Sequence, residues 1–255
     1  NCARVCHSPS LKGMRTTIGE GAATNPFDDI YKTENIVVMG SNTTEAHPIV
    51  ANRMIKAARD KTATLSVIDV RQTQLSKFGE QLIIPYEANL LVLNMMAYVI
   101  LSEKLYNKEF IDSRCTGFEA YKDSILNDPY ANPEYMKNVS GYEYLTEQIP
   151  TVARLYATKK SMFFWGLGIT EHLDGSYAVM AITHLAMMTG NIGKTGTGLM
   201  PLRGQNNVQG ACDTGCLPYY GPDYTVPEEI GLMTPQLIDE MIAEKIKAMY
   251  VMGED

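Results

Sequence analysis

The chain has 255 residues, and its 45% hydrophobic and 20% charged content is that of an ordinary globular protein. A net charge of −7 disfavours nucleic acid or an anionic membrane surface as the main partner. The longest apolar stretch, residues 90–101, contains Asn94 and is far shorter than the ~20 residues of a membrane span. Five cysteines, an odd and small number, indicate free or metal-bound thiols in a reducing compartment. We therefore expect a cytoplasmic protein without a membrane span.

Strands and helices alternate along most of the chain. Short, largely apolar runs predict strands at residues 35–39, 64–69, 81–85 and 161–165. Longer runs predict a helix that ends at residue 59 and further helices at 87–105, 143–158 and 176–188. Strands separated by helices are typical of βαβ units. The predicted fold is α/β, a parallel sheet flanked by helices, as in a Rossmann-like dinucleotide-binding domain.

The C-terminal quarter is predicted to be different. Glycine, proline and polar residues dominate residues 194–224, which indicates a loop longer than compact domains usually contain without a function. A helix at 235–246 and a strand at 248–252 would then begin a second α/β unit. We expect an α/β dinucleotide-binding domain at residues 1–200, and a ligand-binding loop with a partial second domain at 201–255. A first residue other than Met and a strand close to the last residue indicate a fragment.

The N-terminal motif Cys-Ala-Arg-Val-Cys-His, residues 2–7, joins a thiolate ligand to a group that titrates near neutral pH. Covalent haem attachment is disfavoured because its signature is C-x-x-C-H, whereas the spacing here is C-x-x-x-C-H. Three interpretations stay open. They are a redox-metal site, two packed thiols, and a structural zinc or iron–sulfur site that combines Cys2, Cys6, Cys212 and Cys216.

A second motif occupies residues 201–213, Pro-Leu-Arg-Gly-Gln-Asn-Asn-Val-Gln-Gly-Ala-Cys-Asp. Its four amide side chains and two glycines can present many hydrogen-bond donors to a planar polar ligand. The guanidinium of Arg203 forms a fork that matches a carboxylate with two parallel hydrogen bonds. An arginine near a metal is what a small carboxylate substrate would require.

Together these motifs resemble the catalytic (alpha) subunits of formate dehydrogenases, in the molybdopterin oxidoreductase family related to dimethyl sulfoxide reductase. Three intervening segments agree in order: His-Pro-Ile-Val at 47–50, Trp-Gly-Leu-Gly at 165–168 and Thr-Gly-Asn-Ile-Gly at 189–193. The resemblance covers nearly the whole chain. It implies oxidation of formate to carbon dioxide with transfer of two electrons to a partner subunit or protein.

The resemblance also implies roles for individual residues. The metal ligand, a cysteine or selenocysteine in the family, corresponds to Cys6. The neighbouring His7 would receive the proton, and Arg203 would orient formate. The metal, molybdenum or tungsten, would be held by two molybdopterin guanine dinucleotides per full subunit. A 4Fe–4S cluster is expected only in an N-terminal domain outside this sequence.

The remaining expected site residues belong to the cofactor cradle. A strand that meets a helix at Gly40 suits a pyrophosphate, because backbone N–H groups are free at a helix start. Asp69, at the end of the next strand, is placed to bond ribose or guanine. The full predicted set is Gly40, Ser41, Asn42, Glu45, Asp69, Arg71, Gly166, Gly168, Thr170, Gln205 and Asn206.

Two other functions stay open. One is a different molybdopterin oxidoreductase, for nitrate or another oxyanion, although a histidine after the metal ligand favours formate. The other is a metal- or nucleotide-binding module without catalysis, and the isolated fragment itself is expected to be inactive. His47, before Pro48, is predicted to start a helix near the cofactor.

Overall fold

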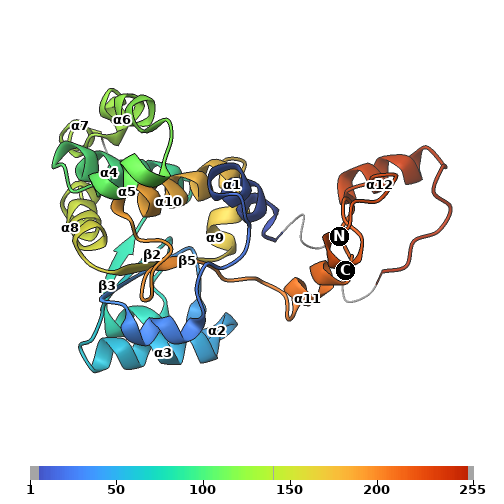
Figure 1. Cartoon of the computed structure of the whole chain (residues 1–255), viewed down its shortest axis with the longest axis horizontal. Coiled ribbons are helices and arrows are strands. Elements are labelled where there is room, and N and C mark those ends of the chain that lie inside the picture. Colours follow the sequence, from blue (N-terminus) through green and yellow to red (C-terminus); the bar gives the residue numbers. More distant parts are fainter. Residues whose placement is uncertain (1–5, 140, 252–255) are drawn as a thin grey trace.

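Five parallel strands form the sheet of this computed structural model, which describes residues 6–139 and 141–251 (Figure 1). The strands are β1 (Asn35–Met39), β2 (Thr64–Asp69), β3 (Glu80–Ile83), β4 (Ser161–Trp165) and β5 (Gly198–Pro201). They lie in the order β3-β2-β1-β4-β5. The chain runs outward from β1 to β3, then returns to β4 on the other side of β1. Ligands of open α/β sheets bind at such a reversal, beyond the carboxyl ends of the strands. The predicted α/β class is confirmed.

The central strand β1 is buried along its whole length. It pairs in register with β2 from Asn35↔Thr64 and with β4 from Asn35↔Ser161. Val37 and Met39 pack into the core on one face of the sheet, and Ile36 and Val38 pack into the core on the other face. A strand buried on both faces has a continuous apolar sequence instead of an alternating one. This burial explains why the Asn-Ile-Val-Val-Met run was recognisable.

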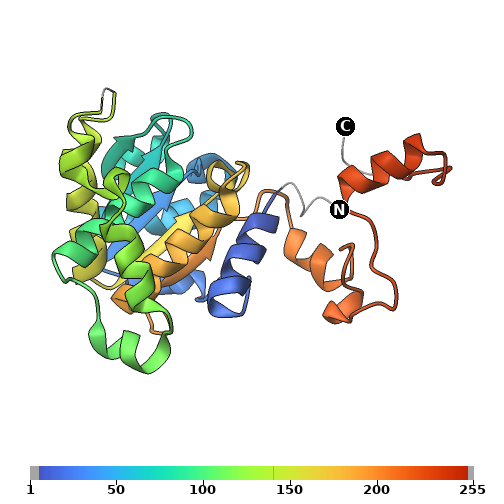
Figure 2. The same cartoon turned by 90° about the horizontal axis from the view of Figure 1, so that it is seen from above.

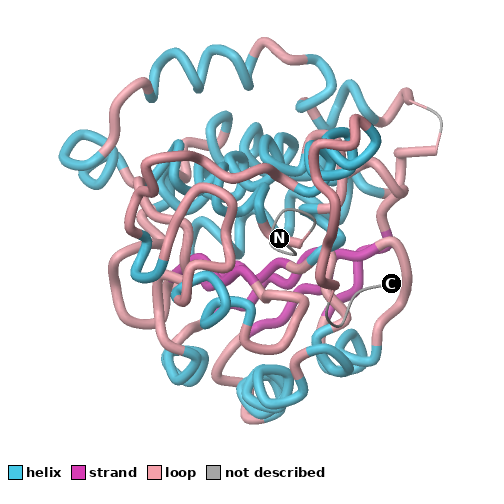
Figure 3. Tube along the Cα trace, turned by 90° about the vertical axis from the view of Figure 1, so that its right-hand side faces the viewer, coloured by secondary structure: helices cyan, strands magenta, loops and turns pink. Residues whose placement is uncertain are grey.

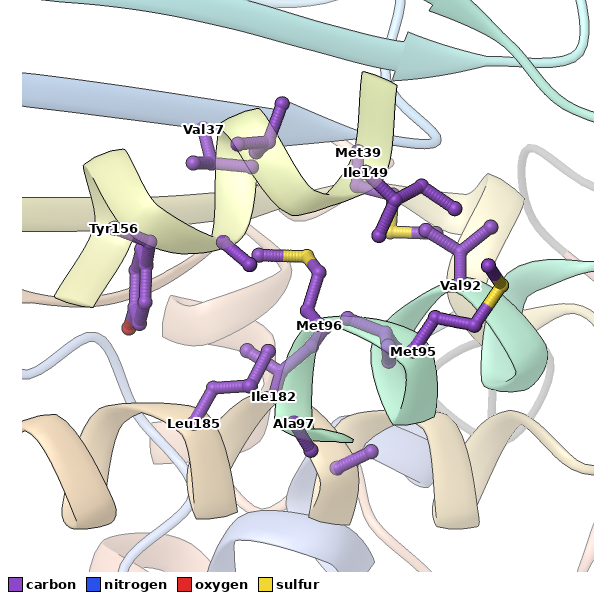
Figure 4. Close-up of a cluster of buried hydrophobic side chains, with 14 of the residues drawn as sticks. Val37, Met39, Val92, Met95, Met96, Ala97, Ile149, Tyr156, Ile182 and Leu185 are labelled. Atoms are coloured by element: carbon purple, nitrogen blue, oxygen red, sulfur yellow. The ribbon is translucent and has the colours of Figure 1, made fainter. Parts of the chain in front are cut away.

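Helices cover both faces of the sheet (Figure 3). The smaller core lies under α3 (Pro48–Arg59). The larger core is covered by α1 (Ser8–Ile18), α4 (Asn89–Ser102), α8 (Leu145–Thr158) and α10 (Gly175–Thr189). Figure 4 shows α4 between its neighbours, with Met95 and Met96 surrounded by apolar side chains of α8 and α10. The apolar stretch at 90–101 is therefore a buried helix, as predicted.

Shorter elements connect these helices and strands. The α-helical segments are α2 (Thr43–Ala46), α5 (Lys108–Arg114), α6 (Phe118–Leu126), α7 (Pro133–Met136), α9 (Leu167–Thr170), α11 (Val208–Asp213) and α12 (Thr234–Ile242). The 3₁₀ segments are η2 (Phe27–Lys32), η3 (Gln74–Phe78), η4 (Pro129–Ala131) and η5 (Pro222–Tyr224). Within the described residues, no helix has the length and apolar character that a bilayer span requires.

The prediction of an unbroken loop at 194–224 is wrong, because the segment contains β5 and α11. All four residues of β5 are buried, and the strand lies at the edge of the sheet with its backbone paired to β4. Its sequence is Gly-Leu-Met-Pro, which has neither the length nor the β-branched residues of a typical strand. A proline is tolerated because an edge strand has a side without pairing.

The predicted strand at 248–252 is not found, since residues 248–251 form no strand and Met252 lies outside the described part. A strand requires a hydrogen-bonding neighbour, and residues 249–251 are exposed. Of the predicted second α/β unit, the structure shows only α12. Figure 2 shows the orange and red segment after β5 extending from one side of the α/β body. The domain boundary at residues 200 and 201 stays a prediction.

Candidate active site

Two glycine-containing turns meet at the carboxyl edge of the sheet, where β1 and β4 end. Gly40 has a φ of 60°, and its carbonyl oxygen accepts a hydrogen bond of 3.0 Å from the Gly168 N–H. A Cβ on Gly168 would lie 2.7 Å from the Gly40 Cα, and one on Gly166 would lie 2.7 Å from the Gly40 carbonyl oxygen. The two turns are in such close contact that a side chain at position 40, 166 or 168 would clash, which explains why all three residues are glycines. Their predicted contact with a cofactor stays a prediction.

The acidic residue predicted to bind the nucleotide lies beside the first of these turns. Asp69 is buried at the end of β2 and accepts a hydrogen bond of 3.3 Å from the Arg71 N–H. Burial raises the pKa of its carboxyl, and backbone N–H groups, including that of Ser41, oppose the rise. Ser41 is also buried, whereas Glu45 and the Arg71 side chain are exposed. The sheet edge thus brings Ser41 and Asp69 together.

The predicted metal ligand is buried next to the loop that follows β5. The Cys6 Sγ accepts a hydrogen bond of 3.3 Å from the Gly204 N–H, and its carbonyl oxygen accepts one of 2.6 Å from the Thr170 hydroxyl. Burial raises the pKa of the Cys6 thiol, while the Gly204 and Gln205 amides and the charge of Arg203 lower it. A Cβ on Gly204 would lie 3.2 Å from the sulfur. Amides directed at the sulfur favour the thiolate, the form that binds metals.

His7 belongs to a buried chain of hydrogen bonds. The Trp165 indole N–H donates to the Ser10 Oγ at 2.8 Å, and the Leu202 carbonyl lies 2.7 Å from the His7 Nε2. Because Leu202 can only accept, the Nε2 carries the proton, and the Ser10 hydroxyl donates to the Nδ1 at 2.8 Å. Burial, reinforced by the charge of Arg203, lowers the pKa of His7 to about 3. His7 is therefore neutral, and both ring nitrogens already have protein partners.

Arg203 is a charged group of the site, and it forms no ion pair with any of the described residues. Its Nη2 donates to the Gly21 carbonyl at 2.8 Å, and its own carbonyl lies 2.7 Å from the His47 Nε2. His47 is the N-cap of α3, as predicted. Burial lowers the pKa of Arg203, and the nearby Cys6 opposes this shift. A desolvated cation without an anion is unfavourable, so the site favours an anionic ligand.

One cavity of about 480 Å³ joins Cys6, His7 and Arg203, which come from the two ends of the described chain. Its wall also includes Arg15, Glu20, Val208, Gln209, Cys212, Asp213, Tyr219 and Tyr224. Two predicted residues of the second motif, Gln205 and Asn206, are exposed and are not in this wall. The structure thus brings the three predicted catalytic residues together, although their chemical roles stay predictions.

The structure also reveals site residues that the sequence analysis missed. Ser10 orients His7, and Asn89, at the start of α4, donates from its Nδ2 to the Gly168 carbonyl at 2.8 Å. Arg15 adds a second guanidinium to the cavity wall. No sequence signal marks these residues, because each also has a partner far away in the chain: Trp165 for Ser10, Gly168 for Asn89 and Tyr220 for Arg15.

The alternative of a structural zinc or iron–sulfur site receives no support from the described residues. Cys2 lies outside them. Among the residues that the structure describes, no group of three or more His, Cys, Asp or Glu side chains could hold a metal. Cys212 is half-buried in the cavity wall and Cys216 is exposed. Cys6 therefore belongs to no multi-residue metal cluster within the described chain, and its role as a metal ligand stays a prediction.

The order of the sheet, with touching turns beyond β1 and β4, defines a doubly wound α/β domain with a parallel sheet. The family model of the molybdopterin oxidoreductases matches residues 1–255, and the chain belongs to this family. This membership confirms the resemblance that the two motifs indicated.

The whole chain is 40% identical to the alpha subunit of an F420-dependent formate dehydrogenase from Methanocaldococcus jannaschii, covering 40% of that protein. It is 37% identical to formate dehydrogenase H of Escherichia coli, covering 38% of it. The chain thus spans about two fifths of the length of these curated relatives. The solved structure of acetylene hydratase from Pelobacter acetylenicus shares the fold, with a TM-score of 0.67 and 22% identity over 78% of this chain and 26% of the hydratase.

Proposed function

We propose that this chain is the metal-ligating part of a formate dehydrogenase, which converts formate into carbon dioxide, a proton and two electrons that pass to a partner subunit or protein. The observation that carries the proposal is a partly buried guanidinium, Arg203, in the same cavity as a buried thiol, Cys6. Arg203 has no counter-ion among the described residues. The cation suits a small carboxylate, and the thiol suits a redox metal.

The residues present fit the cofactor that the family implies. Cys6 offers one sulfur with backbone N–H support, and no three-residue metal cluster competes with it in the described chain. Ser41 and Asp69, at the sheet edge, would hold the nucleotide portion with the glycine turns. When bound, molybdenum or tungsten held by two pterin guanine dinucleotides supplies the two-electron acceptor. The Thr170 hydroxyl is occupied by the Cys6 carbonyl, so we assign it to holding Cys6 in place.

Arg203 orients the substrate in this proposal. Its single hydrogen bond to the Gly21 carbonyl leaves further N–H donors of the guanidinium for a carboxylate. A bidentate pair fixes the direction of the carboxylate as well as its position, so the C–H bond of formate takes a defined orientation. Binding of the anion also satisfies the charge of Arg203, which has no other counter-ion in the described residues.

His7 receives the proton at its Nδ1, which requires the Ser10 hydroxyl to turn away. With a pKa of about 3, His7 is a weak base in the arrangement observed. A formate anion on Arg203 compensates the positive charge that contributes to this low pKa, and so makes His7 a stronger base while substrate is bound. Release of neutral carbon dioxide leaves the charge of Arg203 uncompensated again, so the imidazolium gives up its proton to water in the cavity.

The test uses the full-length subunit with its metal and pterin content measured. Formate-driven reduction of a redox dye is expected in the parent enzyme. Arg203→Lys should raise the KM for formate at least ~10-fold at unchanged metal content, because a point charge cannot reproduce the fork. Arg53→Lys, on the surface of α3, serves as the matched control. Unchanged formate kinetics in Arg203→Lys would remove the basis of the proposal, and turnover of nitrate alone would indicate an oxyanion reductase.

A further inference from the structure

A second, larger cavity of about 1010 Å³ adjoins the first at the start of α1. The two cavities share four wall residues, Ser8, Leu11, Arg15 and Tyr219. Figure 2 shows α1, in dark blue, on the side of the body that faces the orange segment, which contributes Tyr219 to both walls. Arg15 therefore lies at the boundary between this cavity, called the outer cavity here, and the inner cavity of Cys6 and Arg203.

The charge of Arg15 is weakly compensated at this boundary. Its Nη1 donates to the Tyr220 hydroxyl at 2.9 Å, and its Nη2 lies 3.9 Å from the Glu20 carboxylate. The Glu20 side chain is 73% exposed, and an ion pair of this length and exposure contributes little. A carboxylate ligand can therefore replace both partners at small energetic cost.

Other charged groups line the two cavities. Lys12, one turn before Arg15 on α1, lines the outer cavity and forms no ion pair in the part of the chain that the structure describes. His172 and Glu171 also line the outer cavity, and Asp213 lines the inner one. Two guanidinium groups thus line the inner cavity, Arg203 within it and Arg15 at its boundary with the outer cavity.

We propose that Arg15 is a specificity residue that binds the substrate carboxylate at the boundary of the two cavities and passes it to Arg203. The inference rests on the proposed formate dehydrogenase function. A planar guanidinium selects for a small oxyanion before it reaches the buried site, where the unpaired Arg203 binds it more strongly. Arg15 therefore contributes to substrate capture and leaves the chemical step to the inner cavity.

The experiment compares Arg15→Gln and Arg15→Lys in the full-length, cofactor-loaded subunit. Arg15→Gln should lower kcat/KM for formate about 10-fold, the lower end of what local charge does to capture rates, and leave kcat within about 2-fold. Arg15→Lys should restore part of the loss. The dependence of kcat/KM on salt should be shallower in Arg15→Gln, because one of the attracting charges is gone. The inhibition constant of nitrate, a planar monoanion, should rise in parallel.

Arg53→Gln is the matched control on the opposite face of the sheet. Its side chain is 27% exposed against 31% for Arg15, and it also forms one surface ion pair, to Asp28. Equal formate kinetics and salt dependence in Arg15→Gln and Arg53→Gln would overturn the inference, as would a loss of kcat accompanied by loss of metal. If Arg15→Gln behaves like the control while Arg203→Lys still loses efficient formate use, only the inference about Arg15 fails. The proposed function then stands. If the parent enzyme oxidises no formate, the proposed function itself fails.

Discussion

The buried hydroxyl of Ser10 offers a sharp test of how the site is held. Ser10 is fully buried on α1, where it accepts from the Trp165 indole and donates to the His7 Nδ1. Ser10→Ala removes one oxygen atom and leaves a buried indole N–H without an acceptor. The substitution therefore isolates the energetic contribution of this chain of hydrogen bonds.

Three contributions set the expected change in the free energy of unfolding on Ser10→Ala. An unsatisfied buried donor costs about 1–3 kcal/mol, and loss of the bond to His7 costs a further ~0.5–1.5 kcal/mol. The higher helix propensity of alanine recovers less than ~0.7 kcal/mol. We expect Ser10→Ala to lower the free energy of unfolding by about 2–3 kcal/mol.

Urea denaturation of the 255-residue chain measures this loss. Ser113→Ala is the control, because the Ser113 hydroxyl is exposed and bonds within its own helix to the Glu109 carbonyl at 2.8 Å. It should change stability by no more than about 0.5 kcal/mol. A loss below 1 kcal/mol in Ser10→Ala, close to that of the control, would refute the hydrogen-bond chain through Ser10.

Two further predictions concern the sheet edge and α10. Gly40→Ala should lower the free energy of unfolding by about 2–4 kcal/mol, since it combines the strain of positive φ with a Cβ placed 2.8 Å from the Gly168 backbone. Gly19→Ala, with a φ of 84° and open space, isolates the strain, so equal losses would contradict the packing argument. Burial lowers the pKa of His184, so the unfolded chain binds a proton more readily, and stability should fall as pH drops below the ordinary histidine value of ~6.5. In His184→Gln, the urea midpoint should depend less steeply on pH between ~pH 7.5 and 5.5. An equally steep pH dependence would show that other groups cause the loss of stability.

How far the fold could be predicted depends on where each strand lies. Strands β1, β2 and β4 have the predicted bounds because strands buried on both faces leave continuous apolar runs in the sequence. The edge strand β5 was missed, since its pairing with β4 and not its composition makes it a strand. The helix α1 was not predicted either, and Gly13 explains why. A Cβ there would lie 2.8 Å from Val179, so a poor helix former is required for close packing against α10.

The candidate site, like the fold, was predictable where a local motif marks its residues and was missed where only long-range contacts do. Cys6, His7 and Arg203 stood out because the types and order of their motifs are specific, and the structure brings them to one cavity. The hydrogen bond from Trp165 to Ser10 joins residues 155 positions apart, and nothing local in the sequence indicates it. The cradle glycines were assigned to a ligand, whereas the structure shows that their first requirement is contact between two turns. Long-range backbone packing of this kind leaves no separate signal.

The segment that carries Cys6 and His7 takes its geometry from strands that follow it by more than 150 residues. The Thr170 hydroxyl, just beyond β4, holds the Cys6 carbonyl, and the Leu202 carbonyl, just beyond β5, holds the His7 ring. Trp165, the last residue of β4, holds His7 through Ser10. These three anchors start from the carboxyl ends of β4 and β5, so Cys6 and His7 reach their positions only when both strands have joined the sheet. A change that displaces these strand ends should therefore disturb the thiol and imidazole together, even where it touches neither.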